Sequence, residues 1–204
     1  MNTLVSFFVG YLIGSVPTAY LVVKQTSNID IRAVGSGNVG GRNALDVTGK
    51  KSIGAAVVFI DVLKGIVSVL LAYFLFEEKD VSISYAMVGA VAGHCYPVWL
   101  KFKGGRGLAT AAGVFLATSW IWVAAWLVLY FGSSKVLKNV HTSSVAALVG
   151  TPLFAWLLPE RWMGYLVTGF FSHDTFLIAG TLVIAVCLTK HIQPLVEIYA
   201  RKNI

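Results

Sequence analysis

Residues 53–76 read IGAAVVFIDVLKGIVSVLLAYFLF, an apolar run that only two ionisable side chains interrupt, Asp61 and Lys64. A helix needs about 20 mostly apolar residues to cross the roughly 30 Å hydrocarbon core of a membrane, so this run predicts a transmembrane helix. Asp61 and Lys64 are three residues apart and therefore share one helix face. Two interpretations stay open for them, a functional site inside the membrane and an ion pair that orients neighbouring helices.

Comparable apolar runs recur along the whole chain. Of its 204 residues 57% are hydrophobic and 12% are charged, whereas an average globular protein has about 45–50% apolar and 25% charged residues. The composition predicts an all-α, polytopic membrane protein that forms a single domain, residues 1–204. The further runs are Val5–Val23, Ile83–Leu100, Leu108–Phe131, Val145–Leu158 and Trp162–Thr189, the last with a polar break at Ser172–Asp174.

The lysines and arginines indicate the topology, because short loops rich in these residues stay on the cytoplasmic side. Thr118 and Ser119 interrupt the Leu108–Phe131 run, which can be one long span or two short ones. With two short spans and the N-terminus outside, most of the basic residues fall inside. We therefore predict about seven spans, some short, and a cytoplasmic C-terminus. The inside set holds 13 of the 16 basic residues: Lys24, Arg32, Arg42, Lys50, Lys51, Lys101, Lys103, Arg106, Lys135, Lys138, Lys190, Arg201 and Lys202.

Several other classes of protein do not fit this sequence. Val5–Val23 has no basic residue before it and no small-x-small cleavage site after it, so we expect a retained span and not a signal peptide. Cys95 and Cys187 lack the spacing of a disulfide framework or a metal site. The net charge of +7 suits anionic lipid headgroups and phosphorylated substrates and does not call for a nucleic-acid partner.

The first basic loop, residues 34–43, reads VGSGNVGGRN. Its glycines allow the backbone to turn with positive φ and to approach a ligand closely, while Ser36, Asn38 and Asn43 supply hydrogen-bonding groups. The loop contains G-x-G-x-x-G, but a dinucleotide fingerprint needs a preceding strand, and here a membrane span precedes it. We predict a loop that holds a phosphate; the alternative is a flexible linker.

The second basic loop follows the third apolar run, where residues 93–110 read GHCYPVWLKFKGGRGLAT. Lys103 and Arg106 flank Gly104-Gly105 just before the next helix begins. Free backbone amides, a helix N-terminus and two cations can therefore converge on one anion. The alternative is that these cations only anchor the loop on the cytoplasmic side. His191 brings one more titratable group to this side, although a structural role is the commoner one for such a histidine.

These motifs together resemble the bacterial acyl-phosphate-dependent glycerol-3-phosphate acyltransferases, which are seven-helix inner-membrane enzymes. The resemblance covers nearly the whole chain, from Gly14-Ser15 through the 34–43 loop and Asp61 with Lys64-Gly65 to Gly93–Thr110. It implies catalytic roles for Ser36, Arg106 and His191. It implies substrate or phosphate binding by Gly35, Gly37, Asn38, Gly40, Arg42, Asn43, Lys64, His94, Lys103, Gly104 and Gly105.

The chain departs from the family pattern at a few of these positions. Arg42 stands where the family usually has threonine, and Asp46 stands where a basic residue is expected. Arg106 replaces the usual lysine, which keeps the charge but changes the donor geometry. Near the C-terminus Pro194 replaces asparagine and Glu197 replaces arginine. The phosphate site has thus lost polar partners, and Arg42 is a candidate replacement for the missing cation.

The reaction that the resemblance implies is transfer of a fatty acyl group from acyl phosphate to the sn-1 hydroxyl of glycerol 3-phosphate. The products are lysophosphatidate and inorganic phosphate, the membrane is the bacterial inner membrane, and no cofactor or metal takes part. None of the four histidines is followed five residues later by an aspartate, so the His-x4-Asp pair of the acyltransferases with a soluble head domain is absent from the sequence. Two alternatives stay open: a non-catalytic paralogue that binds a lipid or a phosphorylated ligand, and a small transporter. The oligomeric state and the acyl-chain preference are open as well.

Overall fold

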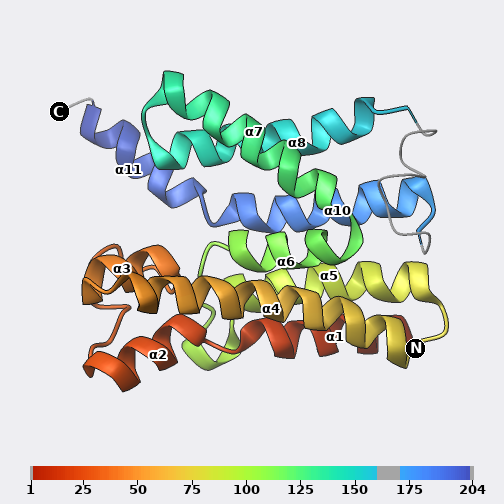
Figure 1. Ribbon diagram of the computed structural model, residues 1–204, viewed down its shortest axis with the longest axis horizontal. Helices are drawn as coiled ribbons and strands as arrows, with labels where there is room; N and C mark the ends of the chain where they lie inside the picture. Colours follow the sequence, from red (N-terminus) through yellow and green to blue (C-terminus); the bar gives the residue numbers. More distant parts are fainter. Residues whose placement is uncertain (1, 160–170, 203–204) are drawn as a thin grey trace.

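A computed structural model describes residues 2–159 and 171–202, and throughout these two ranges the regular structure is helical. The long helices lie side by side along one direction (Figure 1). In chain order the elements are α1 (Asn2–Ser15), α2 (Thr18–Ser27), α3 (Gly41–Thr48), α4 (Lys51–Leu75), α5 (Lys79–Cys95), the short 3-10 helix η1 (Val98–Leu100), α6 (Leu108–Thr118), α7 (Trp120–Leu137), α8 (Val140–Leu157), α10 (His173–Thr189) and α11 (Ile192–Lys202).

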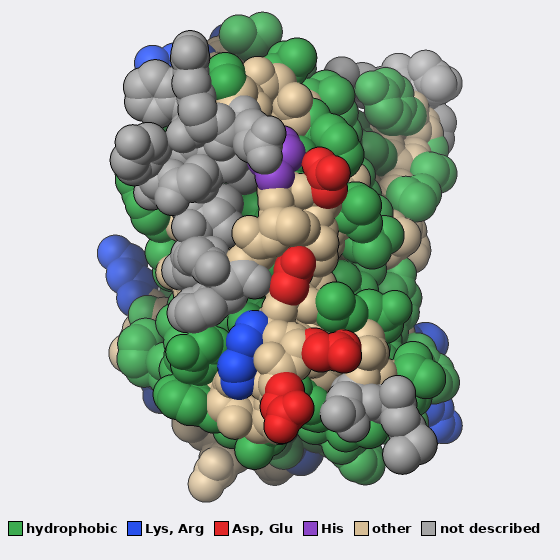
Figure 2. All heavy atoms as spheres, turned by 90° about the vertical axis from the view of Figure 1, so that its right-hand side faces the viewer, with side chains coloured by type: hydrophobic (Ala, Val, Ile, Leu, Met, Phe, Trp, Pro, Cys, Tyr) green, Lys and Arg blue, Asp and Glu red, His purple; other side chains and the backbone are tan. Residues whose placement is uncertain are grey.

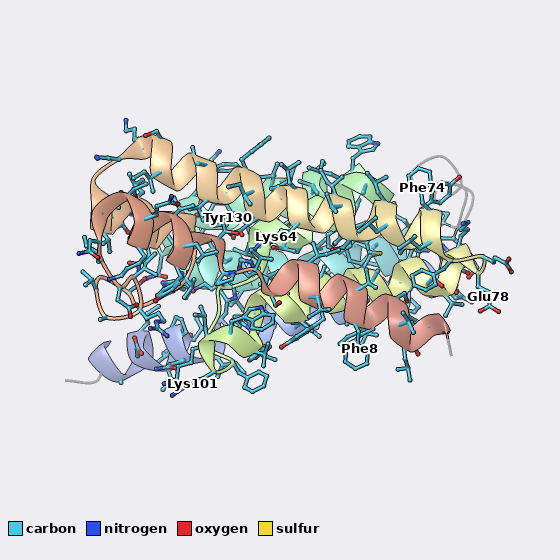
Figure 3. All side chains as sticks on the ribbon, turned by 90° about the horizontal axis from the view of Figure 1, so that it is seen from below. Phe8, Lys64, Phe74, Glu78, Lys101 and Tyr130 are labelled. Atoms are coloured by element: carbon cyan, nitrogen blue, oxygen red, sulfur yellow. The ribbon has the colours of Figure 1, made fainter. Side chains whose placement is uncertain are left out.

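Within the described ranges, four helical segments are long and apolar enough to cross a membrane, and a fifth qualifies if a bent pair counts as one span. Large apolar side chains such as Phe8 and Phe74 are exposed and point away from the bundle (Figure 3), as expected for a surface in contact with lipid. The structure thus supports a multi-pass membrane protein. The segments are Thr3–Ser27, Lys51–Leu75, Trp120–Leu137, Val140–Leu157 and the pair His173–Thr189 with Ile192–Ala200.

Two of the predicted apolar runs are broken. Pro17 separates α1 from α2, because proline cannot donate the hydrogen bond that a helix interior requires. The Leu108–Phe131 run divides at Ser119, whose backbone is extended (φ −161°, ψ 97°), so the expected division into two helices is confirmed. Phe115 stacks on Trp122 across this break at 4.8 Å. Of the predicted run Trp162–Thr189, residues 162–170 lie outside the described residues, and α10 forms its remaining part from His173 to Thr189.

Glycine allows α4 and α6 to cross closely. A Cβ atom on Gly113 would lie 2.0 Å from the Val62 carbonyl oxygen, and one on Gly65 would lie 2.3 Å from that of Thr110. Small residues at such contacts are typical of membrane helix pairs, whose association relies on close packing. The crossing holds the Asp61–Lys64 turn of α4 against the start of α6, and hence beside the loop that precedes α6.

The two ends of the bundle carry opposite charge. The loops at residues 28–40, 101–107 and 138–139 and the α10–α11 junction gather at the end of Figure 1 opposite the N-terminus. Lys101 and Glu78 lie at opposite ends in Figure 3. The end that carries the N-terminus faces the viewer in Figure 2 and shows a cluster of acidic side chains. The basic loops therefore share one end, as the sequence predicts.

Candidate active site

An open cavity of about 810 Å³ lies at the basic end, between the first loop, the α5–α6 loop and the α10–α11 junction. Lys103, Arg106, Lys190 and Arg32 contribute cations to its wall, and Glu197 contributes one carboxylate. The predicted site residues Gly35, Ser36, Gly37, Asn38, Lys103, Gly104 and Arg106 also line it, so both glycine-rich loops meet at one cavity. Its wall is completed by Tyr96, His141, Thr189, Gln193, Pro194 and Ile198.

Asn43 holds the first loop in shape. Its Oδ1 accepts the backbone N–H of Ser36 at 3.0 Å, and its Nδ2 donates to the carbonyls of Ile31 and Val34 at 3.1 and 3.2 Å. Gly35 has φ +65°, which an L side chain rarely adopts. Asn43 is buried and does not line the cavity. Its position favours a supporting role over direct contact with a phosphate.

The α5–α6 loop is fixed by its own backbone. The amides of Gly104 and Gly105 donate to the carbonyls of Cys95 and His94 at 3.2 and 3.1 Å. The expectation that these amides are free for an anion is therefore wrong, since they bind the last turn of α5. A Cβ on Gly105 would lie 2.2 Å from His94 Nε2, so the turn also needs glycine for packing. Lys103 and Arg106 are the cationic side chains of this loop that line the cavity.

Lys103 and Arg106 project from this fixed turn into the cavity. Lys103 is exposed, whereas Arg106 is half-buried, and this burial lowers the pKa of Arg106, which the carboxylate of Glu197 partly offsets. Arginine nevertheless stays charged at any physiological pH. A guanidinium that has already lost part of its hydration is well suited to bind phosphate through paired hydrogen bonds.

The far wall comes from the end of α10 and from α11. Sequence reasoning placed Pro194 and Glu197 of this wall at the phosphate site but did not assign Thr189, Lys190, Gln193 or Ile198. Tyr96 Oη lies 2.5 Å from Thr189 Oγ1, and Lys190 Nζ lies 4.8 Å from the centre of the Tyr96 ring. Burial lowers the pKa of Lys190. Gln193 donates to Glu197 at 3.2 Å. The sequence feature that could have indicated this wall is Lys190, because it directly precedes His191, the histidine that matches the family pattern.

His191 does not reach the cavity. It is 1% exposed, its Nδ1 lies 2.9 Å from the Cys187 carbonyl oxygen, and burial lowers its pKa, which favours the neutral ring. Its ring centre is 6.5 Å from that of His141, which does line the cavity. The expected direct catalytic contact by His191 is therefore not what the structure shows. His141, at the start of α8, was missed because nothing local in the sequence places it here.

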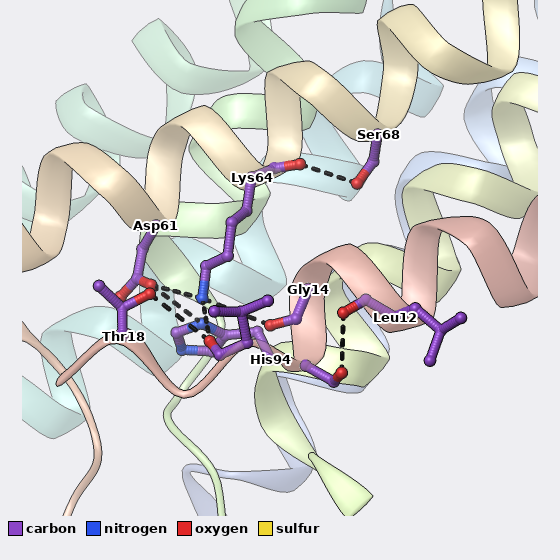
Figure 4. Close-up of polar contacts among 9 residues, drawn as sticks. Leu12, Gly14, Thr18, Asp61, Lys64, Ser68 and His94 are labelled. Carbon is purple, nitrogen blue, oxygen red and sulfur yellow. Dashed lines mark hydrogen bonds and ion pairs between the residues drawn. The ribbon is translucent and has the colours of Figure 1, made fainter. Parts of the chain in front are cut away.

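Lys64 and His94 belong to a separate buried cluster (Figure 4). Lys64 Nζ lies 2.7 Å from Asp61 Oδ1 and donates to the carbonyls of Val16 and Gly14 at 2.8 and 3.3 Å. His94 Nδ1 lies 3.7 Å from the same carboxylate oxygen. Asp61 and Lys64 thus form a buried ion pair, while a functional role for the two residues stays a prediction. With its ammonium group enclosed by three oxygens, Lys64 is not placed to bind a substrate phosphate in the cavity.

Arg42 and Gly40 also lie away from the cavity wall. Arg42 Nε donates to both carboxylate oxygens of Asp46 at 3.0 Å, and its side chain is 76% exposed. It lines a different groove, between α3 and α4. Gly40 is the residue before α3, and its amide donates to the Asn38 carbonyl. The loop was expected to extend to Asn43, but α3 begins at Gly41 and turns Arg42 outward.

Comparison with known proteins places this arrangement in a family. A sequence profile described as Glycerol-3-phosphate acyltransferase matches residues 4–201. The chain belongs to that family. It is 39% identical over 159 residues to the glycerol-3-phosphate acyltransferase of Bartonella henselae, which covers 75% of this chain and 73% of that protein. The protein of the same name from Prochlorococcus marinus (strain NATL1A) is 34% identical over 204 residues, covering 100% and 97%.

Two crystal structures of PlsY, described as an integral membrane glycerol 3-phosphate acyltransferase, have the same fold. The glycerol 3-phosphate form has a TM-score of 0.78 and 28% identity, and it covers 98% of this chain and 93% of that chain. The lysophosphatidic acid form has a TM-score of 0.78 and 27% identity, with the same coverage. This member of the glycerol-3-phosphate acyltransferase family therefore has the integral membrane fold of PlsY, which is the same in the glycerol 3-phosphate and the lysophosphatidic acid forms.

The positions where this family member departs from the usual pattern fall into two groups. Arg106, Pro194 and Glu197 line the cavity, so these changes alter its wall directly. Arg42 and Asp46 pair with each other on the outer side of α3, away from it. The family pattern has a basic residue at the position of Asp46, and Arg42 therefore does not replace that cation in the cavity. The cavity does contain two further cations, Lys190 and Arg32, of which Arg32 is paired with Asp30 at 2.6 Å.

Proposed function

We propose that this protein transfers a fatty acyl group from acyl phosphate to the sn-1 hydroxyl of glycerol 3-phosphate, giving lysophosphatidate and inorganic phosphate for phospholipid synthesis. The observation that carries the proposal is the cationic cavity at one end of a membrane domain, where Lys103, Arg106 and Lys190 face a shared space. Membership of the glycerol-3-phosphate acyltransferase family supports the acceptor substrate. Two phosphorylated substrates need a site with this excess of positive charge.

In the proposed reaction the sn-1 oxygen forms a bond to the acyl carbonyl carbon, and the bond from that carbon to the phosphate oxygen breaks. The departing phosphate accepts the hydroxyl proton, so the step balances without a protein base. Lys103 and Arg106 neutralise phosphate charge, and Ser36 and Asn38 offer hydrogen bonds to the acceptor. The barrier falls because the two substrates are held close together and because fixed cations stabilise the developing charge.

We also propose that the basic end faces the cytoplasm of a bacterium and that the protein crosses the inner membrane about seven times, with its N-terminus outside. The concentration of basic loops at one end and acidic side chains at the other supports this orientation. Single cysteines placed at Lys50 and Lys138 should both be shielded from a membrane-impermeant reagent in intact cells. Labelling of Lys138→Cys from the outside, with Lys50→Cys protected, would contradict this topology.

The activity is tested with purified protein in lipid nanodiscs, palmitoyl phosphate and radiolabelled glycerol 3-phosphate. We expect labelled lysophosphatidate with release of one phosphate per turnover, and loss of product when Lys103→Gln and Arg106→Gln are combined. Lys101→Gln is the matched control, because this lysine is in the same loop but does not line the cavity. Saturable binding of glycerol 3-phosphate without turnover with palmitoyl phosphate or palmitoyl-CoA would refute the reaction and favour the non-catalytic paralogue.

A further inference from the structure

A second groove, of about 560 Å³, runs along the outer side of α4 where α3 packs against it. It is lined by Gly41, Arg42, Leu45, Lys51, Gly54, Ala55, Val58, Phe59 and Val62, none of which lines the cationic cavity. Val58 and Phe59 are 44% and 63% exposed. Because α4 is long and apolar enough to span the membrane and runs along one outer edge of the molecule (Figure 3), this groove opens toward lipid.

The groove is polar at one end only. Arg42 and Lys51 stand at the basic end of the bundle, and Phe59 and Val62 form the opposite, apolar end. From Lys51 to Val62 the α4 axis rises about 16 Å at 1.5 Å per residue. That length is about half of the roughly 30 Å hydrocarbon core, which is the depth of one leaflet. The groove therefore matches the depth of one phospholipid molecule, with one of its acyl chains along α4 and its headgroup at the end where Arg42 and Lys51 lie.

We propose that this groove binds one anionic glycerophospholipid in the leaflet at the basic end of the protein. The charge of the two cations favours an anionic headgroup over a zwitterionic one, since each basic residue near the membrane surface contributes to the attraction. Arg42 bonds Asp46 through Nε, and a guanidinium has five N–H donors, so the terminal nitrogens can bind a second anion. The proposal does not rest on the acyl-transfer reaction.

The groove also gives a role to Arg42 that the cavity does not. The preceding Gly41 allows α3 to lie directly on α4, since a Cβ there would come within 2.8 Å of the Gly54 carbonyl oxygen. This contact places Arg42 beside the first turn of α4 and opens the groove between the two helices. Soluble phosphate can meet the same cations, but only a lipid also fills the apolar half.

The test titrates purified protein in detergent with dioleoyl-phosphatidylglycerol or dioleoyl-phosphatidylcholine, which differ in headgroup charge but not in chains. Native mass spectrometry counts the bound lipid. We expect the first site to prefer phosphatidylglycerol by about tenfold, after discounting Arg42 for its pairing with Asp46. Combined Arg42→Gln and Lys51→Gln should abolish the preference. Lys50→Gln is the matched control, since Lys50 is adjacent and exposed but does not line the groove, and it should keep the preference.

A second pair of variants tests the apolar half of the groove. Ala55→Trp fills it and should weaken binding of both lipids, whereas Ala56→Trp adds the same bulk at an exposed position outside the groove and should not. Equal binding of the two lipids by the wild type overturns the proposal whatever the variants do. It is also overturned if Lys50→Gln loses as much preference as the double variant, or if millimolar glycerol 3-phosphate displaces the bound lipid.

Discussion

Replacing Lys64 by methionine, whose side chain is one atom shorter, should remove the central contact of the buried cluster in Figure 4 while keeping most of the length of the side chain. The ammonium group, on a side chain that is 8% exposed, bonds Asp61 and the carbonyls of Val16 and Gly14. Breaking a buried ion pair by removal of one partner costs about 3–5 kcal/mol, because a buried charge is left without a partner. That is a large part of the roughly 5–15 kcal/mol by which proteins are stable.

The assay is unfolding of the purified protein by SDS in mixed micelles, followed by tryptophan fluorescence. We expect Lys64→Met to lose about 3–5 kcal/mol, and Lys64→Met combined with Asp61→Asn to lose less, because the unpaired carboxylate is gone. Ser68→Ala is the control on the next turn of α4, since it removes one hydrogen bond worth about 1 kcal/mol. A Lys64→Met variant within about 1 kcal/mol of wild type, or a double variant less stable than the single, would refute the reasoning.

Four further predictions concern single residues. Arg106→Gln removes a charged hydrogen bond worth about 1.5–3 kcal/mol and should raise the KM for glycerol 3-phosphate by about 10- to 100-fold; an unchanged KM contradicts its place in the site. Gly105→Ala should abolish turnover, because its Cβ would meet His94 and the Val39 carbonyl, while Gly132→Ala, with open space around it, should leave turnover intact. Arg42→Thr should keep activity within about threefold of wild type in neutral lipid, since Arg42 is outside the cavity. A loss of about 100-fold would contradict this and support the sequence-based hypothesis that Arg42 binds a substrate phosphate. Because burial lowers the pKa of His191 from 6.5, the folded state binds fewer protons than the unfolded state below that pH. Stability should therefore decline as the pH falls from about 6.5 toward the lowered pKa, and His191→Gln should make that decline shallower; an unchanged slope in unfolding measured across pH would contradict it.

The sequence predicted the features that depend on composition and on position along the chain. Apolar runs of membrane length became helices, and the break at Ser119 followed from the polar pair in the middle of its run. The convergence of Ser36, Lys103 and Arg106 on one cavity followed from the expectation that both basic loops lie on the same side. Such inferences need only helix length and the side on which each helix ends.

Side-chain direction and long-range docking could not be predicted in this way. Arg42 and Asn43 are adjacent, yet α3 turns one outward and the other into the loop, because successive helical residues point about 100° apart. His141 lies at the start of α8 and His191 at the α10–α11 junction, far apart in the sequence, and only the packing of these segments decides that His141 faces the cavity. The amides of Gly104 and Gly105 were expected to be free because their acceptors at the end of α5 become apparent only in the folded loop.

Equilibrium binding of radiolabelled glycerol 3-phosphate, measured without acyl donor on purified protein in neutral lipid, tests the central claim most directly. The cationic cavity should bind one molecule per chain, and combined Lys103→Gln and Arg106→Gln should weaken binding by about 100-fold or more, at about 1.5–3 kcal/mol for each charged hydrogen bond lost. Lys101→Gln, in the same loop but outside the cavity, should bind as the wild type does. Wild-type affinity in the double variant would place the glycerol 3-phosphate site elsewhere in the protein and contradict the account.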